Sequence, residues 1–198
     1  MQIFKIFLAS SGELKKERNE IALFIGQENK RLVKQDIFLE LVIWEELVHS
    51  FKGERIQDYF NEEMLKCNIV IALFYKKIGQ FTKEEFKIAC MNLNKGKNLK
   101  QLFVFFKKAN IPPSDITKDV MDVFKLQDEI EKAEQIYDSF ISTQDLILKL
   151  KRQLDLVIPN EIERGKQKPL KQTEKIINNS QVGIIGDNAT IKGGIKFG

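Results

Sequence analysis

Short apolar runs alternate with longer amphipathic segments across residues 1–158. Four of the runs have the length and the β-branched or aromatic content of buried strands: IFKIFLA (3–9), IFLELVIW (37–44), IVIALF (69–74) and QLFVFF (101–106). The segments between them place apolar residues at helical spacing, as Leu14, Ile21 and Ile25 do after the first run. Because strands that alternate with helices form parallel sheets with right-handed crossovers, the pattern predicts an α/β domain with helices on both faces of a central sheet.

Two more helices are predicted after the fourth run. Ser114 or Asp115 can cap the first of them, whose apolar residues recur near helical spacing at Val120, Val123, Ile130 and Ala133. The second covers residues 143–157 and is predicted to end at Pro159, because proline lacks the N–H group that continues a helix. These helices would cover the edge of the sheet and complete the domain.

The sequence changes character after the domain. Residues 159–180 are mostly polar, with five basic and three acidic residues, and are predicted to form a flexible linker. Residues 181–198 contain five of the eleven glycines, and Ile185, Ile191 and Phe197 recur at a spacing of six. This spacing favours stacked β-structure that needs further copies or a partner edge, so the segment is a candidate assembly or docking tail. The alternative is a disordered glycine-rich terminus.

The composition is that of an ordinary soluble protein, with 43% hydrophobic and 30% charged residues. The formal net charge is +4, but lysine and glutamate are interspersed without a sustained basic stripe, so direct binding of nucleic acid is not predicted. A mildly positive surface suits a small anionic ligand such as a dinucleotide. The apolar segment 3–9 contains Lys5 and is too short for a membrane span or a signal sequence, so we expect a cytoplasmic protein without a membrane partner.

The cysteines and the histidine offer little for metal or triad chemistry. Cys67 lies next to a predicted strand and Cys90 on the inward face of a predicted helix, where free thiols behave as small core residues in a reducing compartment. His49 is the one histidine and has no spaced His or Cys partner, so it is predicted to be a loop residue. No metal site is predicted.

The best candidate for chemistry is Glu85, which follows the third apolar run after a short polar loop around Gly79. A carboxylate is thus placed where a strand is followed by a helix, and in open α/β sheets ligands bind outside the carboxyl ends of the strands. At about 100° per residue, one narrow face of the helix holds the apolar residues Phe86, Ala89, Cys90 and Leu93. Glu85 then lies at the border of that face, where it can reach a cleft, whereas Glu84 is expected in water.

A simpler interpretation of Glu85 is also open. Acidic residues near the start of a helix are favoured by its macrodipole, and Thr82 and Glu85 have the spacing of a capping box. On this interpretation Glu85 stabilises the helix and has no catalytic role.

Several of these segments together resemble a Toll/interleukin-1 receptor (TIR) domain of the prokaryotic type. The similar segments are KIFLASS (5–11), IFLELVIW (37–44), IVIALF (69–74) and FTKEEFKIA (81–89). The most specific element is an aromatic residue followed four positions later by Glu and after four more by Ala, which Phe81, Glu85 and Ala89 provide. The resemblance covers about residues 1–158 and implies the flavodoxin-like TIR fold.

In TIR domains that are enzymes, the glutamate of this motif is the catalytic residue of NAD⁺ cleavage, so the resemblance implies that role for Glu85. It also implies that Ser10 and Ser11 border the nucleotide and that Phe81 lines the nicotinamide side. Trp44 and the loop that follows it would gate the pocket and mediate self-assembly. The substrate-binding residues implied by the resemblance are therefore Ser10, Ser11, Trp44 and Phe81.

The activity implied by the resemblance is that of an NAD⁺ nucleosidase or an ADP-ribosyl cyclase. Such an enzyme releases nicotinamide and leaves ADP-ribose or a cyclic ADP-ribose isomer, with NAD⁺ as the substrate and no cofactor. The resemblance further implies activation by self-association through the TIR loops, in bacterial antiphage defence or signalling. Residues 181–198 are the candidate contact for a partner protein.

Two other functions are compatible with the sequence. The chain could be a non-enzymatic TIR-like adaptor that assembles through its loops and tail, with Glu85 as an ordinary acid near a helix start. It is also similar to nucleoside deoxyribosyltransferase-like enzymes at KIFLAS (5–10) and in the Glu followed four residues later by Ala. That family usually places Asp and Gly before its nucleophile, whereas IGQFTKE (78–84) precedes Glu85 here.

Overall fold

The computed structural model describes residues 1–43, 55–78, 80–93, 98–108, 110–132 and 137–166. At residues 56, 80–83, 85 and 164–166 the description covers the backbone and not the side chain. Trp44, His49 and the loop through Gly53 lie outside the described residues, as do residues 167–198 with the predicted tail. The predictions made for those segments therefore stay predictions.

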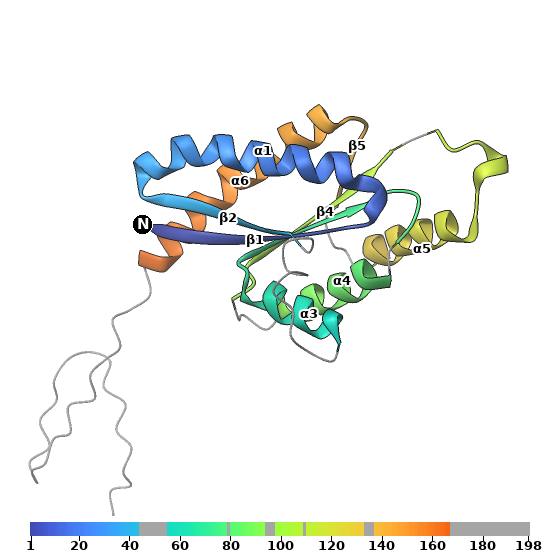
Figure 1. Cartoon of the computed structure of the whole chain (residues 1–198), viewed down its shortest axis with the longest axis horizontal. Helices are drawn as coiled ribbons and strands as arrows, with labels where there is room; N and C mark the ends of the chain where they lie inside the picture. Colours follow the sequence, from blue (N-terminus) through green and yellow to red (C-terminus); the bar gives the residue numbers. More distant parts are fainter. Residues whose placement is uncertain (44–54, 79, 94–97, 109, 133–136, 167–198) are drawn as a thin grey trace, which may run out of the picture.

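A parallel sheet forms the centre of the molecule (Figure 1). Its strands are β1 (Gln2–Ser10), β2 (Ile37–Ile43), β3 (Ile69–Phe74), β4 (Gln101–Lys107) and β5 (Asp138–Phe140). Their order in the described sheet is β2-β1-β3-β4-β5, which is the flavodoxin-like order for a doubly wound α/β fold. The predicted fold class and the four predicted strands are confirmed. The edge strand β5 was not predicted, because three residues are too few to carry a periodic signal.

Helices cover both faces of the sheet, as Figure 1 shows. One face carries α1 (Lys15–Leu32), entered through a short 3-10 helix (Gly12–Leu14), and α6 (Thr143–Lys166). The other face carries α3 (Ile56–Lys66), α4 (Gln80–Leu93) and α5 (Lys118–Lys132). No helix in the described part of the chain is long and apolar enough to cross a membrane.

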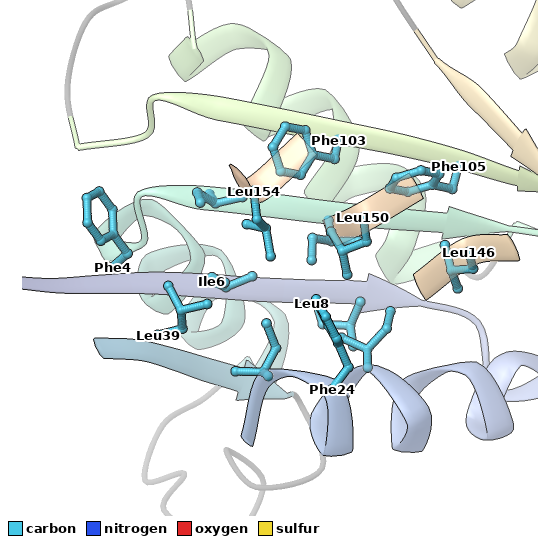
Figure 2. Close-up of a cluster of buried hydrophobic side chains, with 14 of the residues drawn as sticks. Phe4, Ile6, Leu8, Phe24, Leu39, Phe103, Phe105, Leu146, Leu150 and Leu154 are labelled. Carbon is cyan, nitrogen blue, oxygen red and sulfur yellow. The ribbon is translucent and has the colours of Figure 1, made fainter. Parts of the chain in front are cut away.

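The two-residue alternation of β1 divides the core between the two faces. Ile6 and Leu8 point toward α1 and α6, where they belong to one buried cluster with Leu150 and Leu154 (Figure 2). Phe7 instead lies in a cluster on the opposite face. All of these side chains are less than 5% exposed, so β1 is buried on both sides, as a central parallel strand requires.

The register of the strands determines where a ligand site can form. β1 pairs with β2 on one side and with β3 on the other, and Ser10 at the end of β1 lies opposite Leu73 near the end of β3. The chain order of the strands reverses at β1, so the crevice between the carboxyl ends of β1 and β3 is the topological switch point. In open α/β sheets this is the usual place for ligands.

The last helix is longer than predicted. The sequence pattern predicted an end at Pro159, but α6 continues through this proline to Lys166. The first residues of the predicted linker, up to Lys166, are therefore helical. The reason is packing: the apolar positions Leu150, Leu154, Ile158 and Ile162 continue at intervals of four and stay against the core, while the exposed Pro159 removes one backbone hydrogen bond.

The start of α5 also differs from the prediction. Neither Ser114 nor Asp115 caps it, because both lie in a separate 3-10 helix (Pro113–Asp115). Thr117 takes this place, since its Oγ1 accepts the N–H of Val120 at 3.4 Å. Of the four residues predicted for the inward face of α5, Val120, Val123 and Ile130 are buried, whereas Ala133 lies outside the described residues.

Candidate functional site

The carboxyl end of β1 is held by a buried arginine. Ser10 and Ser11 are 6% and 5% exposed, and Arg18 of α1 is 3% exposed. The Nη1 atom of Arg18 donates to Ser10 Oγ and to the carbonyl oxygen of Ser11, both at 2.9 Å. The two serines implied to border a nucleotide thus lie together at the switch point, with a guanidinium cation directly against them.

Glu13 joins this turn to the loop after β3. Its Oε1 accepts the backbone N–H groups of Lys76 at 3.0 Å and Lys77 at 3.1 Å, and it also accepts the Ser11 hydroxyl at 3.2 Å. Two loops that are 63 residues apart in the chain are therefore fastened by one carboxylate. They lie at the carboxyl ends of the paired strands β1 and β3.

A buried ion pair spans from α1 to the end of β4. Glu17 Oε1 lies 2.7 Å from Lys107 Nζ, and the side chains are 3% and 26% exposed, respectively. Lys107 Nζ also lies 4.9 Å from the ring centroid of Tyr75, which follows β3. This contact fixes the position of the lysine at the carboxyl edge of the sheet.

Charged side chains of both signs lie around the carboxyl ends of β1, β3 and β4. The cations Arg18, Lys76, Lys77, Lys107 and Lys108 lie there with the anions Glu13 and Glu17. The cations can attract an anionic ligand, in particular one with a diphosphate.

Glu85 lies in the second turn of α4, which begins at Gln80. The helix is anchored beside the end of β3 by Phe86, whose ring meets that of Phe74 edge-on at a centroid distance of 5.8 Å. Phe86 and Ala89 are buried, so the inward face predicted for this helix is confirmed. For Phe81 and Glu85 themselves, the side chains lie outside the described part of the structure.

The capping interpretation of Glu85 does not agree with the start of α4. A capping box would make Thr82 the N-cap residue, whereas Thr82 is already the third residue of the helix. The first turn of α4 contains no acidic residue. This excludes a capping box with Thr82 as the N-cap, while the interpretation of Glu85 as a helix-stabilising acid stays a prediction.

The prediction that Glu84 points into water was wrong. Its side chain is 31% exposed and accepts two hydrogen bonds from α3 and its start: Asn61 Nδ2 donates to Oε1 at 2.9 Å and Arg55 Nη2 to Oε2 at 2.8 Å. The buried Gln57 in turn donates to Asn61 Oδ1 at 3.0 Å. The error arose because the pattern of α4 shows its contact with the sheet, while α3 covers a second side of the helix. Glu84 thus ties α4 to α3.

Cys67 is not poised as a nucleophile. Cys67 and Cys90 are both free, and burial raises the pKa of the Cys67 thiol to about 12. With this raised pKa the thiol is protonated at neutral pH, and its Sγ donates to the carbonyl oxygen of Glu63 at 3.3 Å. Cys67 is therefore a buried core residue. Among the residues with described positions, no group of three or more His, Cys, Asp or Glu side chains is arranged to hold a metal ion.

Arg18 and Glu17 were missed by the sequence analysis, although one signal for Arg18 was present. Leu14, Ile21 and Ile25 define the inward face of α1, and Arg18 lies one turn after Leu14 on the same face. A charged residue at such a position has to be paired inside the protein. No comparable signal exists for Glu17, because its partner Lys107 is 90 residues away in the chain.

Comparison with known proteins does not assign a family. No family model matches the sequence, and no curated protein matches it either. The described fold is a flavodoxin-like α/β arrangement, with Ser10 and Ser11 buried at the topological switch point.

Proposed function

We propose that this protein is a TIR-type NAD⁺ glycohydrolase in which Glu85 is the catalytic carboxylate. The observation that carries the proposal is the position of Glu85 in the second turn of α4, beyond the carboxyl end of β3. β3 pairs with β1, so this helix starts next to the switch point where Ser10 and Ser11 lie. The resemblance of the sequence to prokaryotic TIR domains supports the same assignment.

The proposed reaction needs few polar groups. The nicotinamide of NAD⁺ is already a cationic leaving group, so the glycosidic C–N bond can break with its electron pair moving to the ring nitrogen and without a general acid. The carboxylate of Glu85 would stabilise the oxocarbenium-like ribosyl centre that develops. Water then forms the new C–O bond and loses a proton to give ADP-ribose, or an adenine nitrogen attacks in the same way to give a cyclic isomer.

The cations at the carboxyl edge of the sheet support binding of the substrate. The diphosphate of NAD⁺ carries two negative charges, and Lys76, Lys77 and Arg18 contribute cations on the two sides of the crevice. Ser10 and Ser11 would border the nucleotide, with Ser10 Oγ oriented by the hydrogen bond from Arg18. Phe81 and Trp44 would complete the nicotinamide side.

Self-assembly is the proposed activator. Ordering of the loop after Trp44 by a neighbouring copy would close the pocket, and residues 181–198 would bring copies or a partner protein together. In this proposal the protein acts in the bacterial cytoplasm, where NAD⁺ depletion or a cyclic ADP-ribose signal serves antiphage defence.

The test is NAD⁺ cleavage by the full chain at high protein concentration, with nicotinamide and ADP-ribose products separated by chromatography. Glu85→Gln should keep the fold and lose about 10²- to 10³-fold in rate, on the scale of one lost electrostatic contact to the transition state. The matched control is Glu129→Gln on the exposed side of α5, which removes the same charge away from the site and should keep the rate.

Two results would contradict the proposal. If Glu85→Gln cleaves NAD⁺ at the wild-type rate, Glu85 is not the catalytic residue. No cleavage by assemblies that demonstrably form would favour the adaptor function, and transfer between a deoxynucleoside and a free base would favour the deoxyribosyltransferase-like function.

A further inference from the structure

A cleft lies beyond the carboxyl ends of β4 and β5 and beside α5. Figure 1 shows α5 on the face of the sheet that also carries α3 and α4. Its volume of about 890 Å³ is within the range of small-molecule sites. The described residues that line it come from the ends of these strands, from Tyr75 and from α5 with the segment before it. None of the described lining residues comes from β1, α3 or α4, while Tyr75 and Lys107 also belong to the carboxyl edge described above.

The charge of the cleft selects for anions. Lys107 and Lys108 line it, and none of the described lining residues is acidic. Lys107 is held in place by Glu17 at 2.7 Å, while Lys108 is exposed and brings a further positive charge to the mouth. Asn110 and Gln127 add side-chain amides, which can donate to and accept from a ligand.

Part of the lining is apolar and partly aromatic. Phe106 and Val123 line the cleft and are buried, whereas Phe124 lines it with 47% of its surface exposed. A large exposed aromatic side chain at the edge of a cleft offers a face on which a flat ring can stack. An aromatic wall, amides and lysines are thus combined in one cavity.

We propose that this cleft binds a nucleoside phosphate, with the base against Phe124 and the phosphate near Lys107 and Lys108. Inorganic phosphate would leave the apolar wall unused, and a fatty acid would leave the amides of Asn110 and Gln127 unused. A nucleotide uses all three kinds of group. Occupancy of this cleft is measured without turnover, so the result does not depend on whether the protein cleaves NAD⁺.

The experiment measures binding of trinitrophenyl-AMP by fluorescence, with displacement by AMP, using the full chain. Phe124→Ala and Lys108→Glu should each weaken binding about tenfold, consistent with the loss of one stacking contact or of phosphate attraction. The matched controls lie on α5 outside the cleft: Met121→Ala removes a side chain of similar exposure, 44%, and Lys125→Glu reverses a charge. Both controls should bind within about twofold of the wild type.

Several outcomes would overturn the inference. These are the absence of saturable binding, an equal loss in test and control variants, and displacement by inorganic phosphate or dodecanoate as effective as displacement by AMP. A change in sedimentation of Phe124→Ala with unchanged probe binding would make this face a contact between protein chains instead. Circular dichroism of each variant verifies that its fold is intact.

Discussion

Removal of Lys107 should destabilise the protein much more than removal of the charge on its partner Glu17. The two residues form an ion pair of 2.7 Å, but their surroundings differ: the Glu17 side chain is 3% exposed and that of Lys107 is 26% exposed. The partner that is left behind determines the free-energy cost, because a buried charge without its counterion is expensive and one that can reach water is not.

The magnitudes follow from these exposures. In Lys107→Met the Glu17 carboxylate stays inside the protein without its cation, and we expect a loss of about 3–5 kcal/mol in the free energy of unfolding. In Glu17→Gln the lysine keeps its contact with the Tyr75 ring and can turn toward solvent, and the Gln amide oxygen can still accept its hydrogen bond. The expected loss is about 1–2 kcal/mol.

Urea unfolding followed by circular dichroism measures both values, with comparison of midpoints at constant slope. The double variant Glu17→Gln/Lys107→Met removes both charges and should be more stable than Lys107→Met alone, which gives a direct measure of the coupling. If Glu17→Gln costs as much as Lys107→Met, or if the double variant is the least stable of the three, the argument from unequal burial is wrong.

Three further results are expected. Glu84→Ala should lower the free energy of unfolding, measured in urea, by about 1–2 kcal/mol, because the buried Asn61 loses a hydrogen-bond acceptor. The control Asp58→Ala breaks an exposed ion pair and should change this free energy by less than about 0.5 kcal/mol. Equal effects of the two substitutions would contradict the link between α3 and α4. The pKa of Cys67 is about 12 in the folded protein against an ordinary value of 9.0, so the unfolded chain releases this proton first. The contribution of Cys67 to stability should therefore be constant below pH 9 and fall between pH 9 and 12, by up to about 1.4 kcal/mol per pH unit. In urea unfolding at several pH values, Cys67→Ala should lose stability less steeply over this range than the wild type. Pro159→Ala should increase the free energy of unfolding by about 1 kcal/mol, because it restores a backbone hydrogen bond in α6, and the midpoint of thermal unfolding should rise. A lower midpoint would show that the proline stabilises the helix at this position.

The strands and the inward faces of the helices were predictable because burial leaves a local pattern. The run Ile69–Phe74 is apolar throughout since β3 is buried on both faces, and Phe86 and Ala89 repeat at helical spacing since one side of α4 packs on the sheet. The strand β5 has three residues and leaves no such pattern. The helix α6 does continue its apolar pattern beyond Pro159, but the proline led to the prediction of a helix end.

The candidate site was predictable only in part. Ser10 and Ser11 could be placed at the end of a strand and Glu85 near the start of a helix, because these positions follow from the order of elements. The partners that shape the site come from distant parts of the chain: Lys107 for Glu17, and Asn61 for Glu84. Such pairings depend on how the helices and strands pack together. They leave no periodic pattern of apolar and polar residues in the sequence.

The Glu13 carboxylate has a consequence for motion at the carboxyl edge. The amide hydrogens of Lys76 and Lys77 lie in a loop, yet both are bonded to a side chain from the opposite side of the crevice. These amide hydrogens can exchange with solvent only when their hydrogen bonds to the Glu13 carboxylate break. Breaking those bonds also releases the turn after β1 from the loop after β3. The two sides of the crevice should therefore open as one cooperative unit, in which the protection of two neighbouring amides reports on a carboxylate 63 residues away.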